Sequence, residues 1–263
     1  MLEYKNLYKT YPDGTEALKD VSFEVEDGEF LVIIGLSGSG KSTLLRCTNR
    51  LIEPTAGQIV WDGTDIAALP LKDMRTVRSK IGMVFQHFNL VKRLSVTNNV
   101  LSGRLGYTSN GSSLFYKFSD EDRSKAEAAL ERVGLTEQAN KRASELSGGQ
   151  QQRVGIARAL MQEPKIILAD EPVASLDPVL AHAILGDLER LNKEDGITVI
   201  CSLHYLDLVQ RYATRVIGLR DGKVVYRGTG EDIRKMTDEE FKEIYGEEAE
   251  RVSAGPSITG GQA

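Results

Sequence analysis

The segment Gly35-Leu-Ser-Gly-Ser-Gly-Lys-Ser42 has the spacing G-x-x-x-x-G-K-[ST], which is typical of loops that hold phosphate groups. The apolar run before it, from Glu29 to Gly35, predicts a strand buried on both faces, and a helical pattern begins at Lys41. Glycines let successive backbone N–H groups point inward, and the helix adds the partial positive charge of its N-terminus. A plain glycine-rich turn is the alternative, and the flanking strand and helix disfavour it.

Two positions of this loop have separate chemical tasks. Lys41 would hold the β- and γ-phosphates of a polyphosphate, and Ser42 would bind Mg²⁺. The neighbouring positions would supply the cradle, so we expect ligand contacts from Gly35, Ser37, Gly38, Ser39, Gly40, Lys41, Ser42 and Thr43.

A second apolar strand, Ile166-Ile-Leu-Ala169, delivers two adjacent carboxylates, Asp170 and Glu171, at its C-terminal end. Open α/β sheets bind their ligands at that end of the strands. Asp170 would hold the Mg²⁺ shell, and Glu171 would orient or deprotonate an attacking water. Acidic residues at a solvated strand end are commonplace, so this interpretation depends on the phosphate loop.

The whole-chain composition is that of an ordinary globular protein. Of its 263 residues 41% are hydrophobic and 27% charged, and its net charge of −5 disfavours nucleic-acid binding. The longest apolar stretch, Phe30 to Leu36, is too short to cross a bilayer, and Met1-Leu-Glu-Tyr-Lys5 lacks the apolar core of a secretory signal. We interpret Cys47 and Cys201 as reduced packing residues, without a disulfide.

The order of elements predicts a parallel α/β core with additions. We expect a small antiparallel β layer at the N-terminus, a helical segment in the middle third, and serine or threonine caps that begin two of the helices. The expected elements are strands over Leu2–Tyr11, Ala17–Glu26, Gln58–Trp61, Ile81–Phe85, Lys165–Ala169 and Ile197–Leu203, a helical region over Ser95–Glu163, a helix over Val179–Lys193, a hairpin over Val216–Tyr226, capped helix starts at Ser119 with Asp122 and at Thr237 with Glu240, and a mobile tail after Gly246.

The segment Leu146-Ser-Gly-Gly-Gln150, followed by a helical run to Pro164, resembles the signature motif of the ABC ATPases. A Ser-Gly-Gly turn that opens a helix is a second anion site. The resemblance implies an α/β P-loop NTPase of ABC type, with a mixed-sheet core and antiparallel β subdomain (1–94 and 164–246), a helical subdomain (95–163) and a flexible tail (247–263). It also implies ATP as ligand and a head-to-tail homodimer in which ATP lies between the loop of one subunit and Ser147, Gly148, Gly149 and Gln150 of the other.

Other positions of the chain match this family. By resemblance, Gln86 senses the metal and the membrane subunit, Asp177 lies across the dimer interface, and His204 contacts the γ-phosphate. Tyr11 lies where the family often stacks an aromatic ring on adenine, with Tyr8 and Tyr4 as competitors. An ordinary solvated or packing role is the alternative for each of these side chains, and their joint order along the chain favours function.

The assignment to a branch of the family depends on less specific sequence features. The segments Phe88–Val96, Val100–Tyr107 with the lengthened stretch to Phe118, and Glu171–Pro178 are similar to phosphonate-import ATP-binding subunits. Tyr205 and Leu206 depart from that pattern and leave a phosphite or hypophosphite system open. An importer ATPase for polar amino acids or phosphate is the first alternative, a non-transport ABC protein the second, and an ATP-binding module without turnover the third.

The resemblance also implies partners and a location. These are integral membrane permease subunits and, indirectly, a solute-binding protein, with the chain at the cytoplasmic face of the membrane. Residues Phe85 to Val96 are candidates for the surface that meets the permease, and packing within the helical subdomain is the alternative.

Overall fold

The computed structural model describes residues 1–107 and 118–246. Our expectations for the lengthened segment 108–117 and for the tail 247–263 lie outside the described residues. None of the described helices is long and apolar enough to cross a membrane.

A six-stranded mixed sheet forms the centre of the molecule, in the strand order β10-β9-β3-β8-β7-β6. Neighbouring strands from β9 to β6 are parallel, and only β10 is antiparallel, to β9. The strands β3, β6, β7 and β8 are buried along their whole length because both faces of the sheet are covered, as the unbroken apolar runs predict. The bounds are β3 Phe30–Ile34, β6 Ile81–Val84, β7 Ile166–Ala169, β8 Thr198–Ser202, β9 Arg215–Arg220 and β10 Lys223–Gly228.

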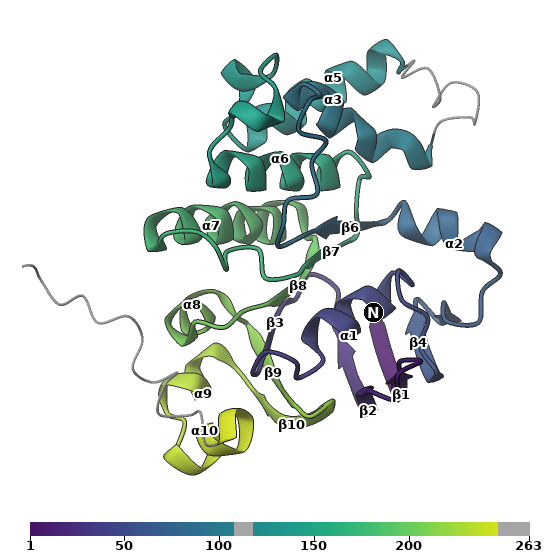
Figure 1. The fold of residues 1–263 in the computed structure, drawn as a ribbon, viewed down its shortest axis with the longest axis vertical. Helices are drawn as coiled ribbons and strands as arrows, with labels where there is room; N and C mark the ends of the chain where they lie inside the picture. The colour runs from purple at the N-terminus through teal and green to yellow at the C-terminus, as the bar shows by residue number, and fades with distance from the viewer. Residues whose placement is uncertain (108–117, 247–263) are drawn as a thin grey trace, which may run out of the picture.

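A second, antiparallel sheet has the order β2-β1-β4-β5. It confirms the predicted β layer and adds to it the strand that contains Trp61. Helix α1 (Lys41–Thr48) packs between the two sheets, where Leu44 and Leu45 are fully buried in a core shared by both (Figure 1). The bounds are β1 Leu2–Thr10, β2 Glu16–Val25, β4 Ala56–Trp61 and β5 Thr64–Asp65.

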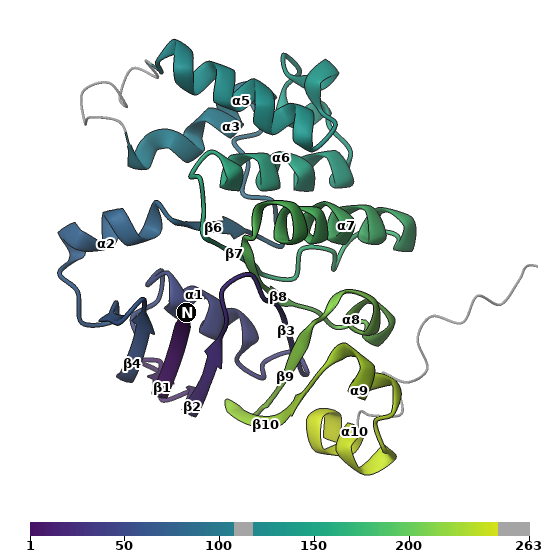
Figure 2. The same cartoon turned by 180° about the vertical axis from the view of Figure 1, so that it is seen from behind.

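The described helical elements between β6 and β7 form one end of the molecule (Figures 1 and 2). The predicted cap of Ser119 with Asp122 is confirmed as a reciprocal capping box at the start of α5. The elements are α3 Val96–Leu101, α5 Asp120–Arg132, α6 Gly148–Leu160 and the 3₁₀ turns Ser102–Gly106, Thr136–Gln138 and Ala143–Glu145.

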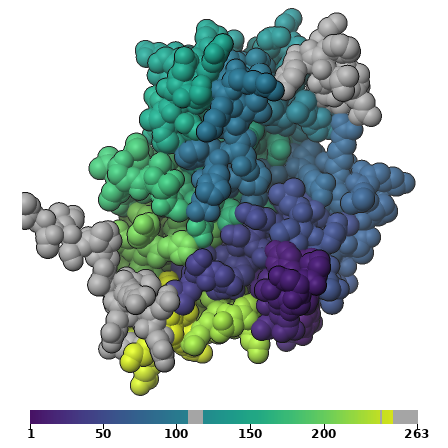
Figure 3. Space-filling model, in the orientation of Figure 1, coloured from purple at the N-terminus to yellow at the C-terminus, as the bar shows by residue number. Residues whose placement is uncertain are grey.

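The remaining helices flank the central sheet. Helix α7 (Pro178–Asp195) lies between the sheet and α6, and α8 (Leu206–Tyr212) continues this layer (Figure 1). The helices α9 (Gly230–Arg234) and α10 (Asp238–Tyr245) pack near β9 and β10, and the cap of Thr237 with Glu240 is confirmed. Helix α2 (Leu71–Arg78) lies before β6. In the space-filling view, the N-terminal strands and the helical end occupy opposite parts of one face (Figure 3).

Both cysteines are fully buried and free, which confirms them as packing residues. Burial raises the pKa of the Cys47 thiol to about 12, and it also raises the pKa of Cys201. Thiols in such surroundings are inert because the thiolate is the reactive form.

Candidate nucleotide site

The phosphate loop joins β3 to α1, as predicted. Gly35, Gly38 and Gly40 have φ angles of 141°, 82° and 106°, a region that side chains other than that of glycine rarely adopt. A Cβ on Gly35 would also overlap the carbonyl oxygen of Leu219 on β9, so the loop lies directly against the neighbouring strand. The tight turn therefore requires glycine.

Lys41 points back into its own loop. Its Nζ donates to the carbonyl oxygens of Gly35 (2.8 Å) and Leu36 (2.9 Å), and only 3% of the residue is exposed. Burial lowers its pKa to about 8, against the opposing effect of the carboxylates of Glu171 and Asp170. The hydroxyl of Ser39 is also buried in this loop and has no partner among the described residues. A buried cation and an unsatisfied hydroxyl at a helix N-terminus fit an anionic ligand.

Asp170 directly follows β7 and is 2% exposed. Its Oδ1 accepts hydrogen bonds from the hydroxyls of Ser42 (2.6 Å) and Ser202 (3.4 Å). Its Oδ2 pairs with Arg46 of α1 at 3.1 Å. The predicted contact between the strand end and the loop is therefore present. A hydroxyl and a carboxylate side by side are the oxygen ligands that Mg²⁺ prefers, so these residues fit the metal.

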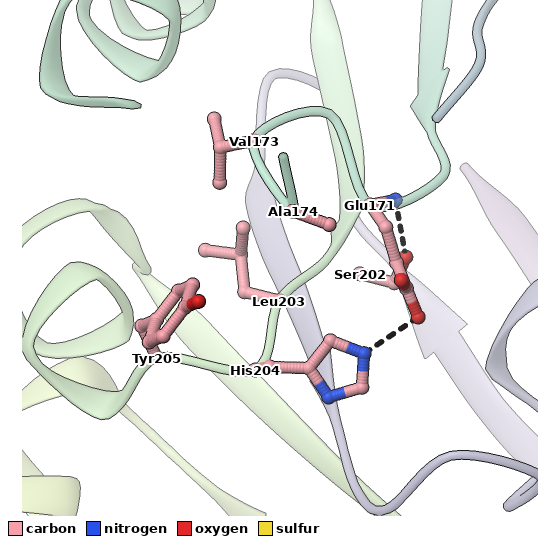
Figure 4. A pocket seen from close by; sticks show the side chains of 7 residues that line it. All are labelled: Glu171, Val173, Ala174, Ser202, Leu203, His204 and Tyr205. Carbon is pink, nitrogen blue, oxygen red and sulfur yellow. Dashed lines mark hydrogen bonds and ion pairs between the residues drawn. The ribbon is translucent and has the colours of Figure 1, made fainter. Parts of the chain in front are cut away.

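Glu171 and His204 meet beside this carboxylate, at the ends of the neighbouring strands β7 and β8 (Figure 4). His204 Nε2 lies 2.6 Å from Glu171 Oε1, and this hydrogen bond is the main reason that the pKa of Glu171 is lowered. Glu171 has a φ of 47°, and its backbone N–H donates to the Ser202 hydroxyl at 2.9 Å, which fixes the direction of its side chain.

An open cavity of about 170 Å³ lies along this pair, with room for several water molecules. Glu171 and His204 provide its charged and polar wall, and its other lining residues are Val173, Ala174, Ser202, Leu203 and Tyr205 (Figure 4). An ionised carboxylate that faces such a space can orient a water or take a proton from it.

Gln86 lies two residues beyond β6, half-buried. The carbonyl oxygen of Val84, two positions earlier, accepts the backbone N–H of Asp170 at 2.9 Å. The parallel pairing of β6 with β7 therefore places Gln86 at the same sheet edge as the two carboxylates.

Tyr11 is half-buried beside α1. Its hydroxyl shares a hydrogen bond of 3.1 Å with that of Thr43, which holds the ring next to the phosphate loop. Tyr4 is fully buried and bonded to Thr48, so it offers no free face to a ligand. Tyr8 is exposed on β1.

The signature turn lies elsewhere in the chain. Ser147 is the N-cap of α6 and forms a reciprocal capping box with Gln150. Helix α6 and the phosphate-loop helix α1 lie on opposite faces of the central sheet, so one chain does not bring the two anion sites together (Figures 1 and 2).

The structure brings the signature turn instead to the segment of Asp177. A Cβ on Gly148 would lie 3.4 Å from Leu176, and one on Gly149 would lie 3.1 Å from Leu180. Asp177, between these leucines, is the N-cap of α7, and its Oδ1 accepts from Leu180 N at 3.0 Å.

Three side chains of this region were absent from the sequence prediction: Arg46, Ser202 and Arg158. Arg46 follows Ser42 by four positions on α1, the spacing that places two side chains on one helix face. The sequence could therefore have indicated that Arg46, like Ser42, contacts Asp170. Ser202 and Arg158 make contacts between elements far apart in sequence, and no local pattern marks them.

Fold and site together define a phosphate-loop protein built to bind and hydrolyse a nucleoside triphosphate. The family profile described as "ABC transporter" matches residues 18–174, and the chain belongs to this family. Among its relatives, the Phosphonates import ATP-binding protein PhnC of Bdellovibrio bacteriovorus is 56% identical over 96% of both chains. PhnC 3 of Halalkalibacterium halodurans is 51% identical over 94% of both chains.

A solved structure agrees with this placement. It is the dimeric, post-hydrolysis state of an ATP-binding cassette bound to ADP and phosphate, which is 39% identical and superposes with a TM-score of 0.76. The match covers 87% of this chain and 98% of that one.

Proposed function

We propose that this chain is the ATP-hydrolysing subunit of a bacterial importer for phosphonates or phosphite-type oxyanions. The observation that supports hydrolysis most directly is the 2.6 Å contact between Glu171 and His204, next to Lys41 and Asp170. The observation that supports the solute class is the naming of relatives that are more than half identical over nearly the whole chain.

The loop residues would hold the phosphates. Lys41 would give up its hydrogen bonds to the carbonyl oxygens of Gly35 and Leu36 and contact the β- and γ-phosphates instead. Ser42 and Asp170 would hold Mg²⁺, with Gln86 at the same edge, and the metal would neutralise phosphate charge. Glu171 would orient the water and receive its proton as the water oxygen bonds to the γ-phosphorus and the bond to the β-phosphate oxygen breaks. ADP and phosphate are then the products.

His204 has two tasks in this proposal. Bonded to Glu171 it holds the carboxylate ionised and aimed at the cavity. When ATP is bound, its imidazole N–H would contact the γ-phosphate, and Glu171 would then be free to act on the water.

The second half of each ATP site would come from another copy of the chain. The signature turn offers a helix N-terminus and two glycines, and it lies across the central sheet from the phosphate-loop helix of its own chain. A head-to-tail homodimer would place it across the γ-phosphate, and the dimeric cassette among the similar structures supports this arrangement. The dimer would act on membrane permease subunits at the cytoplasmic face, with a solute-binding protein on the other side.

The test is steady-state ATPase activity of the chain reconstituted in lipid with its permease and solute-binding protein. Stimulation by a phosphonate-loaded or phosphite-loaded binding protein, absent in Glu171→Gln, is the expected result. Stimulation by an amino acid alone would keep the ATPase and overturn the solute class. Absence of hydrolysis in the wild-type complex would overturn the proposal that the chain is an ATPase.

A further inference from the structure

The turn Phe88–Asn89 follows Gln86 and has an unusual backbone. Phe88 has a φ of 57° and Asn89 a φ of 49°, so two consecutive residues other than glycine adopt the left-handed conformation. This conformation is strained for residues other than glycine, most of all for a bulky side chain. This turn therefore persists only because its surroundings hold it.

Arg158 of α6 holds the turn. One nitrogen of its guanidinium donates to the carbonyl oxygen of Asn89 at 2.6 Å, and another donates to that of Phe88 at 2.9 Å. Burial lowers the pKa of this guanidinium, and no carboxylate of residues 1–107 or 118–246 offsets that effect. The fork geometry of arginine matches two neighbouring carbonyls in a way that a lysine does not.

The ring of Phe88 lies close to the start of the same helix. A Cβ on Gly148, the first residue of α6, would lie 3.8 Å from Phe88 Cζ. Helix α6 therefore lies against the turn in two places, at Arg158 near its C-terminal end and at Gly148 in the signature turn.

We infer that Arg158 is a positioning residue that locks the Gln86 segment to the signature helix, so that both move as one body when ATP binds. Gln86 is two residues from the clamped turn and lies at the edge of the sheet that carries Asp170. A displacement of either end is passed on to the other because the clamp is short and doubly bonded. This inference rests on the proposed ATPase function. It adds a contact that couples the segment of Gln86, beside the phosphate loop, to the signature turn.

The kinetic test compares two matched substitutions on α6. Arg158→Lys keeps the charge and loses the fork, whereas Arg153→Lys makes the same change where the guanidinium pairs with the Asp187 carboxylate at 3.0 Å. In the reconstituted complex we expect Arg158→Lys to lower the stimulated kcat about tenfold with KM for ATP within about twofold, and Arg153→Lys to change neither. Equal kcat values for all three proteins, or parallel losses in both variants, would overturn the inference.

A distance measurement keeps the clamp testable without hydrolysis or permease. Spin labels at His87→Cys and at Glu127→Cys of α5 lie on exposed positions, and the native cysteines are buried and inert. In a Glu171→Gln background with MgATP, we expect one narrow distance distribution, and a broad one when Arg158→Lys is added. Coincident distributions would contradict the clamp even if the ATPase proposal holds.

Discussion

The phosphate loop and the signature turn are both Ser/Gly-rich helix starts, yet the chain prepares them in opposite ways. At α1 no side chain caps the helix, and its first residue, Lys41, lies within the influence of the carboxylates of Glu171 and Asp170. At α6 Ser147 and Gln150 satisfy each other's backbone N–H groups. The first is a charged, reactive half-site, and the second is a neutral and rigid one.

This difference fits the proposed homodimer, in which each ATP site would need both halves. The chemical groups for hydrolysis gather at the loop, where the ends of the parallel strands meet. The signature turn would contribute a helix dipole, a fixed shape and the Ser147 hydroxyl, all acting on a phosphate brought by another subunit. Substitutions in the phosphate-loop site should therefore lower the ATPase rate far more than substitutions that loosen the signature turn.

The largest effect is expected from Glu171→Gln, which removes the ionised carboxylate from the cavity. Hydrolysis should fall at least about 100-fold, while ATP affinity stays within a few fold because the phosphate contacts remain. Radiolabelled ATP binding and steady-state turnover measure the two. Glu189→Gln, which alters only surface ion pairs with Lys193 and Arg211, is the control. Normal turnover in Glu171→Gln would remove this residue from its role.

A mixing experiment should separate the two halves. Lys41→Ala breaks the loop, and Gly148→Asp places a carboxylate where a phosphate would approach α6. The new Asp suits a helix N-terminus and meets only ordinary contacts, so folding should persist. Each variant alone should be nearly inactive.

A one-to-one mixture of these variants should recover about a quarter of wild-type activity, because half the dimers are mixed and each mixed dimer has one intact site. Reconstituted ATPase assays at several mixing ratios measure this recovery. Two copies of one variant give no intact site and serve as the controls. A mixture no more active than its components would contradict the sharing of sites between subunits.

The sequence predicted the parts of the fold whose signals are local. The strand before Gly35, the helix at Lys41 and the capping boxes at Ser119 and Thr237 each depend on a few adjacent residues. The helices α2 and α8 were missed because both are short and their N-cap residues, Pro70 and Tyr205, provide no side-chain cap. Their existence depends on packing against the sheet, which no local pattern records.

For the site, the sequence supplied most of the candidate residues but not all of their contacts. Asp170 and Glu171 could be placed at the end of a strand, and His204 at the end of another. Their meeting depends on β7 and β8 being neighbours, which follows from the sheet order alone. The Arg158 clamp depends on how α6 lies against the turn after β6, so it could not be foreseen.

A smaller effect should appear as proton uptake at Lys41. Its pKa of about 8 in the free chain lies below the ordinary value of 10.5, so the neutral form grows as the pH rises above 8. ATP favours the ammonium, so binding should take up a small fraction of a proton near pH 7 and most of one near pH 9. Affinity should fall over the same interval. Calorimetry in buffers of different ionisation enthalpy measures the uptake, and a pH-independent value would contradict the buried lysine.

The smallest effect compares two serine caps of the same type, Ser147 on α6 and Ser119 on α5. Replacing either serine with alanine removes one side-chain acceptor from a helix N-terminus, so each variant should lose about 1 kcal/mol of unfolding free energy. Urea titrations measure that loss. Only Ser147→Ala should also slow the reconstituted ATPase, by a few fold, because its hydroxyl would face the γ-phosphate of the other subunit. Equal ATPase rates in the two variants would mean that the Ser147 hydroxyl caps its helix and does nothing more.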